Sequence, residues 1–221
     1  MPEFAYPRVE GSDLPLKMPV ASLSEMELPA SVLDNCGSRQ PTLLESYAGP
    51  IVMAGRDVAV IGATPRGAEQ VAPLLLPLVG RLAGAKRPAN AASKTAPTCK
   101  PRAIVLVPTR SLATYAAGLA SALSERTEVR CARAFGGMAI ESSVAECTSG
   151  VDLLVATPGR LIDLLERGTV ALSAVRFLTL VGADTLFDAG FEAHLRRLIL
   201  DEGMPSSPAR CSPFASPQHA L

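Results

Sequence analysis

Short apolar runs that alternate with helix-patterned stretches constrain the fold of this chain more than any other feature. The apolar runs cover Val58–Gly62, Ala103–Val107, Val129–Phe135, Val151–Ala156 and Phe177–Val181. Continuous apolar strands separated by helices are typical of a parallel sheet that helices cover on both faces. The sequence therefore predicts an α/β fold, a doubly wound parallel sheet, whose ligands bind beyond the carboxyl ends of the strands.

The stretches between these runs set the expected domain organisation. Helices are predicted over residues 24–35, 41–54, 68–82, 111–123, 138–147, 158–167 and 191–200. Residues 1–22 are expected to be an irregular tail and residues 23–221 a single domain, since a domain runs to roughly 100–200 residues. A hydrophobic fraction of 48% with 19% charged residues excludes a globally disordered chain.

Composition also narrows the classes of function. Lys plus Arg and Asp plus Glu each number 21, which excludes a uniformly basic nucleic-acid binder but leaves room for a local patch. The five cysteines show no C-x-x-C spacing, so neither a zinc site nor a disulfide framework is predicted. No apolar stretch reaches the ~18 residues of a membrane span, and no signal peptide is recognisable. These features predict no membrane association and an intracellular location, cytoplasmic or nuclear.

Residues 84–102 depart from the alternating pattern. This stretch is rich in Ala, Lys, Pro and Ser and contains no acid. Six cations lie within or just before it, at Arg81, Lys86, Arg87, Lys94, Lys100 and Arg102. Two interpretations stay open: a solvated low-complexity loop, or a basic arm that attracts phosphate backbones.

The residues after four predicted strands form an ordered set of motifs. They read Pro108-Thr-Arg-Ser-Leu-Ala113, Phe135-Gly-Gly137, Ala156-Thr-Pro-Gly-Arg-Leu161 and Val181-Gly-Ala-Asp184. In this order the chain resembles the first RecA-like domain of the DEAD-box RNA helicases, which has a P-loop NTPase fold. The segment from Val151 to Gly168 looks closest to the Vasa/Belle subgroup. The resemblance covers most of the chain, and no second RecA-like domain is expected within the 221 residues.

The resemblance implies an RNA-binding surface formed by three of these motifs. Its members are Pro108, Thr109, Arg110, Gly136, Gly137, Thr157, Pro158, Gly159 and Arg160. Glycines allow a backbone to approach a phosphate closely, and helix N-termini and arginines supply donors to it. The expected partner is therefore single-stranded RNA, or an RNA–protein particle, bound without base readout.

The motifs that the family uses for ATP differ here. The phosphate loop of the family aligns with Gly62-Ala-Thr-Pro-Arg-Gly-Ala-Glu69, where Ala68 and Glu69 replace the lysine and the metal-binding hydroxyl. Val181 and Gly182 replace the first two acids of the D-E-A-D motif. Pro65 replaces a glycine and thereby removes a backbone donor.

Other positions of the ATP and coupling motifs also depart. Leu23 aligns with the aromatic that stacks on adenine, Glu45 with the adenine-reading glutamine, and Ser216-Pro-Gln218 with the S-A-T motif. Thr64, Gly67 and Asp184 are left as a vestigial ATP pocket. No catalytic residue, no metal site and no cofactor is expected, and binding of ATP with magnesium is doubtful.

The sequence thus favours an RNA-binding, DEAD-box-like domain without ATPase activity of its own, a pseudoenzyme. Two alternatives stay open. The chain could be a protein-interaction scaffold in an RNA–protein particle, or a fragment of an ATP-dependent RNA helicase that retains some ATP binding.

Overall fold

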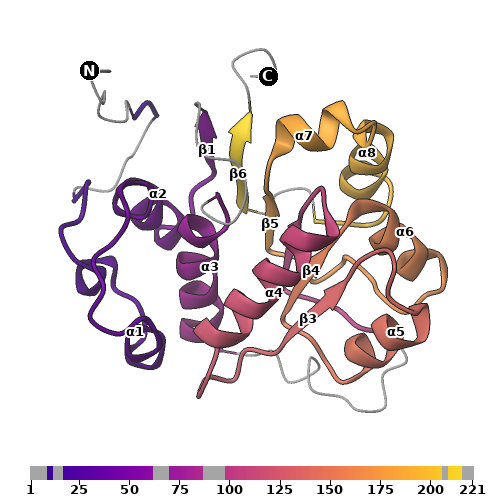
Figure 1. The fold of residues 1–221 in the computed structure, drawn as a ribbon, viewed down its shortest axis with the longest axis horizontal. Helices are drawn as coiled ribbons and strands as arrows, with labels where there is room; N and C mark the ends of the chain where they lie inside the picture. Colours follow the sequence, from indigo (N-terminus) through magenta and orange to yellow (C-terminus); the bar gives the residue numbers. More distant parts are fainter. Residues whose placement is uncertain (1–8, 12–16, 62–69, 87–97, 206–208, 216–221) are drawn as a thin grey trace.

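A computed structural model describes residues 9–11, 17–61, 70–86 and 98–205 in full, and the backbone of residues 209–215. In this part of the chain, six parallel strands form one sheet in the order β1-β6-β5-β2-β4-β3 (Figure 1). They are β1 (Val58–Ile61), β2 (Ala103–Leu106), β3 (Cys131–Ala134), β4 (Leu153–Ala156), β5 (Phe177–Leu180) and β6 (Ala209–Ala215). The predicted doubly wound class and the five predicted strands are confirmed.

The sixth strand was not predicted. Its sequence, ARCSPFA, contains a proline and two polar residues and shows no continuous apolar run. Proline normally argues against a strand inside a sheet. Nevertheless β6 pairs with both β1 and β5, so it connects β1 to the rest of the sheet.

The helices differ from the prediction mainly near the N-terminus. They are η1, a 3₁₀ turn (Leu23–Met26), α1 (Ala30–Cys36), α2 (Leu43–Met53), α3 (Ala72–Gly84), α4 (Arg110–Leu123), α5 (Ile140–Thr148), α6 (Pro158–Glu166), α7 (Ala183–Asp188) and α8 (Glu192–Leu200). The single helix predicted over 24–35 is divided, because Glu27 adopts a left-handed conformation (φ 56°) and Pro29 follows it. Helix α7 was not predicted.

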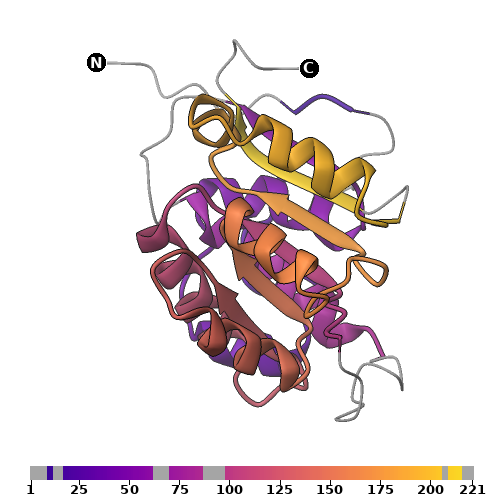
Figure 2. The ribbon, with the colours of Figure 1, turned by 90° about the vertical axis from the view of Figure 1, so that its right-hand side faces the viewer.

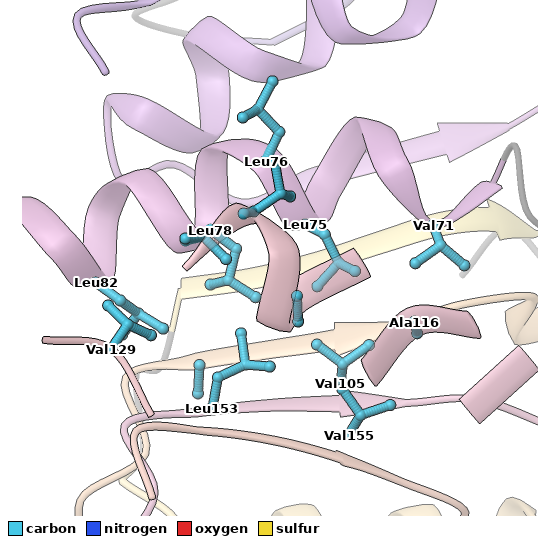
Figure 3. Packing of buried hydrophobic residues seen from close by; sticks show 14 of the residues in the cluster. Val71, Leu75, Leu76, Leu78, Leu82, Val105, Ala116, Val129, Leu153 and Val155 are labelled. Atoms are coloured by element: carbon cyan, nitrogen blue, oxygen red, sulfur yellow. The ribbon is translucent and has the colours of Figure 1, made fainter. Parts of the chain in front are cut away.

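Two large hydrophobic cores lie on the two faces of the sheet, and alternate residues of β2 and β4 belong to different cores. Ala103 and Val105 of β2 face one core together with α3 and α4, whereas Ile104 and Leu106 face the other. Figure 3 shows leucines of α3 packed over Val105, Leu153 and Val155. Figure 2 shows the helices of the second half of the chain on the opposite face. The centre of the sheet is therefore covered on both faces, and the strand ends are the places at which a ligand can bind.

A buried ion pair joins the amino ends of the central strands. Arg102, directly before β2, donates from Nε to Oδ1 of Asp152 at 2.9 Å, and both side chains are almost fully buried. The backbone N–H of Arg130 donates to the other carboxylate oxygen at 3.1 Å. The structure therefore corrects one part of the prediction for residues 84–102, because Arg102 belongs to the folded body and not to a solvated arm.

Candidate nucleic-acid interface

The predicted motifs meet at the carboxyl edge of the sheet. Hydrogen bonds continue beyond the strands: Val107 donates to the carbonyl of Ala156 at 3.0 Å, and Thr157 donates to the carbonyl of Ala134 at 3.1 Å. These bonds hold the turns after β2, β4 and β3 in register. The turns after β2 and β4 lead directly into α4 and α6, whose N-termini therefore lie at this edge.

Arg110 lies against the glycine doublet. Its guanidinium is so close to Gly136 and Gly137 that a Cβ atom on Gly137 would overlap Nη1, and one on Gly136 would lie 3.5 Å from Nη2. Gly137 also has a φ of +89°, which favours glycine. Thr109 starts α4 as its N-cap, with its hydroxyl accepting from the N–H of Leu112 at 3.2 Å. Arg110 and Thr109 are both exposed, so a cation and a glycine turn form one accessible surface.

Arg160 has a different environment. Its Nη2 donates to the carbonyl of Met138 at 2.9 Å, and its Nη1 donates to the hydroxyl of Ser143 at 3.0 Å. The side chain is 10% exposed, and Asp163 lies 3.6 Å from Nε. Nε itself is buried without a hydrogen-bond partner among the described residues. Arg160 thus ties α6 to the turn that follows the glycine doublet, while its role as an RNA contact stays a prediction.

The remaining predicted residues complete this edge. Thr157 is the N-cap of α6 and makes no side-chain capping bond, and Pro158 occupies the first helical turn. Gly159 has open space where a Cβ would be, so packing against the described residues does not require glycine there. Pro108 and Thr157 are half-buried. Backbone N–H groups in the first turns of two helices, together with an exposed arginine, can bind successive phosphates of a strand.

The strand end after β5 offers few groups to a metal or nucleotide. Val181 is 1% exposed, and Gly182 is left-handed (φ +63°) at the N-cap of α7. Asp184 is half-buried, and its Oδ1 accepts from the N–H of Thr185 at 2.7 Å. Thr64 and Gly67, the other predicted members of the ATP pocket, lie outside the described residues. Among the described residues no group of three or more His, Cys, Asp or Glu side chains could hold a metal ion.

Glu45 is fully buried and committed to partners in its own chain. Arg39 donates to both of its carboxylate oxygens at 2.7 Å, and the N–H of Thr42 donates to Oε2 at 2.8 Å. Glu45 and Thr42 together form the capping box of α2. Burial alone would raise the pKa of Glu45, but the hydrogen bonds from Arg39 and Thr42 outweigh it and the pKa is lowered. Arg39 was not predicted as a partner of Glu45, because it precedes the helix and belongs to no motif.

This lowered pKa leads to a prediction about pH. A carboxyl whose folded pKa lies below its unfolded value of about 4.3 stabilises the fold above that value, and the contribution is lost as the pH falls through the folded pKa. At neutral pH we expect Glu45→Gln to be less stable than the unmodified chain, with the gap shrinking in acid. Urea unfolding at neutral pH and at about pH 3 measures this. A gap that does not change with pH would contradict it.

Comparisons with known proteins agree with this geometry. The family model described as "DEAD/DEAH box helicase" matches residues 45–208. A DEAD-box ATP-dependent RNA helicase 52A from Oryza sativa subsp. japonica is 36% identical over 211 residues, which cover 91% of this chain and 34% of the rice protein. A crystal structure of a DEAD box protein from the hyperthermophile Methanococcus jannaschii matches with a TM-score of 0.71 at 23% identity, covering 89% of this chain and 50% of that one.

The chain belongs to the DEAD/DEAH box helicase family, because the family model covers well over half of it. The prediction of a DEAD-box, RecA-like domain is thereby confirmed, while the Vasa/Belle subgroup stays a prediction. The chain spans about a third of the rice relative's length. None of the helices within the described residues has both the length and the hydrophobicity that a transmembrane helix requires.

Proposed function

We propose that this domain binds single-stranded RNA at the carboxyl edge of its sheet and does not hydrolyse ATP. The observation that carries the RNA part is the placement of the exposed Arg110 guanidinium against Gly136 and Gly137. A strand can approach closely at glycines while the arginine neutralises a phosphate. Binding through the backbone in this way is independent of base sequence.

The second part of the proposal concerns nucleotide. The family's ATP chemistry needs carboxylates for the metal and a positioned water, and the described residues do not fit that requirement. Val181 and Gly182 bring no carboxylate, and both oxygens of Glu45 are already engaged by Arg39. We therefore propose that the surface binds RNA, either alone or within an RNA–protein particle. This binding is not coupled to a cycle of ATP binding and hydrolysis.

The RNA surface is tested by replacing Arg110. Loss of one charge-assisted contact is expected to weaken binding of a fluorescent uridine-rich RNA about tenfold at low salt. The slope of log affinity against log salt should fall by about 0.7, because one fewer counterion contact is made to a single strand. Arg110→Ala and Arg110→Lys are compared by fluorescence anisotropy, and the lysine variant should retain most of the salt slope.

Arg167→Ala is the matched control, since Arg167 is exposed at the opposite end of α6. It should leave both affinity and slope nearly unchanged. Equal losses in Arg110→Ala and Arg167→Ala would show that net charge alone drives binding. That outcome would remove the carboxyl edge as the RNA surface.

A further inference from the structure

A basic cavity lies at the edge of the sheet opposite to the candidate RNA surface. It has a volume of about 880 Å³ and is lined by the end of α3 and by the residues that lead into β2 and β5. Because Arg102 and Arg176 directly precede those two strands, the cavity belongs to the amino edge, whereas Arg110 follows β2 at the carboxyl edge. In Figure 1 the arrowheads of β1 and β6 point toward the carboxyl edge. Cavities of roughly 300–1,000 Å³ are typical of ligand sites.

Three of the four cations among the described lining residues have no acidic partner in the described part of the chain. Arg81, Lys86 and Arg176 line it, and none of them forms an ion pair with a described residue. Arg102 also lines it but is paired with Asp152. Among the described lining residues Glu27 is the one acid. Cations that converge on a concave surface without acidic partners create a positive potential that attracts an acidic ligand.

Apolar side chains form the floor of the cavity. Phe177, Val175 and Met53 line it, and Phe177 is 7% exposed. The Arg81 guanidinium lies over the Phe177 ring, 5.5 Å from its centroid, and donates to the carbonyl of Met53 at 2.7 Å. These contacts fix the position of one cation at the boundary between the apolar floor and the charged rim.

We propose that this cavity binds an acidic peptide segment of a protein partner, with carboxylates on the rim cations and an apolar side chain on the floor. Concave sites of this kind recognise peptides by a few anchors and by charge complementarity. A nucleic-acid strand would leave the apolar floor unused, because Phe177 is the one aromatic among the described lining residues and Arg81 covers its ring. The inference does not depend on RNA binding at the other edge.

The experiment uses the full chain and a fluorescein-labelled peptide of alternating glutamate and leucine. Arg81→Gln combined with Lys86→Gln and Arg176→Gln is expected to weaken its binding at least tenfold. The control combines Arg126→Gln, Arg167→Gln and Arg196→Gln, which remove the same charge from exposed positions outside the cavity. A peptide with glutamine in place of glutamate should bind weakly to every variant.

A second variant guards against loss of folding. Lys86→Glu with Arg176→Glu reverses two exposed charges and leaves Arg81 and its contacts intact. It should abolish peptide binding while circular dichroism and the melting temperature stay near those of the unmodified chain. Equal weakening by the cavity and control sets would overturn the proposal. The proposal would also be overturned if the triple cavity variant lost binding to uridine-rich RNA but kept binding to the peptide. The cavity would then be part of the RNA-binding surface.

Discussion

Replacing Arg102 by alanine is expected to lower the free energy of unfolding by about 3–5 kcal/mol, since it removes the buried cation that donates to the buried Asp152 carboxylate. Asp152 is fully buried, and its backbone also pairs with residues 102 and 103 on one side and residue 130 on the other. The lost ion pair therefore lies where three chain segments meet. Urea unfolding followed by circular dichroism measures the loss.

A paired replacement separates the cost of removing one buried cation from the cost of lost packing. Arg102→Met combined with Asp152→Leu removes both charges, and such exchanges of buried pairs are often neutral or stabilising. In this chain the backbone N–H of Arg130 and the carbonyl of Leu82 would each lose a partner, so part of the loss should persist. If Arg102→Ala alone is as stable as the unmodified chain, the Arg102–Asp152 ion pair does not stabilise the junction of these strands, and this assignment is wrong.

The second large expected effect concerns nucleotide binding and hydrolysis. The unmodified chain is expected to show no RNA-stimulated ATPase and no thermal shift with Mg-ADP. Pro65→Gly, Ala68→Lys and Glu69→Thr restore the family's phosphate loop, and an ion pair at ~4 Å is worth roughly 4 kcal/mol at an effective dielectric of 20. Half of that value already corresponds to about a thirtyfold gain in affinity, and a bound ligand raises stability by RT ln(1 + [L]/Kd). Differential scanning fluorimetry with Mg-ADP measures the gain.

The structure indicates that restoring acids at the first two D-E-A-D positions would have a different effect from repairing the phosphate loop. Gly182 is left-handed (φ +63°), so a glutamate there is strained by roughly 1–2 kcal/mol. Val181 is 1% exposed, so an aspartate would bury a charge. We expect the two acid substitutions to destabilise the domain, and the loop repair alone to restore affinity without turnover. ATPase activity in the unmodified chain that persists through purification and responds to RNA would contradict the proposed loss of catalysis.

Much of the fold was predictable because its strands are continuous apolar runs. The sequence patterns of β2, β4 and β5 agree with their buried positions in the centre of the sheet. β6 escaped prediction because Pro213 and Ser212 interrupt its pattern, and its place in the sheet depends on pairing with strands distant in sequence. Helix periodicity also failed at Glu27, where a left-handed residue ends η1. Local patterns cannot reveal pairing between distant segments.

The candidate site was predictable in part for a similar reason. Ordered motifs at strand ends located Thr109, Arg110, Gly136 and Gly137, which the fold brings together. The same patterns could not show that Arg160 is held by Ser143 and Met138, since these hydrogen bonds join residues 17 and 22 positions apart in the sequence. Nor could they show the Arg39 partner of Glu45, or the basic cavity, whose cations come from three separate segments.

RNA titration with and without Mg-ATP, at about 50 and about 200 mM salt, tests the central claim most directly. The full chain is titrated into a fluorescent uridine-rich single strand, with Arg110→Ala as the surface variant. We predict binding that weakens steeply with salt, depends on Arg110 and is the same with and without Mg-ATP. Binding that requires Mg-ATP, or no binding at the lower salt, would contradict the account of an RNA-binding domain without a nucleotide cycle.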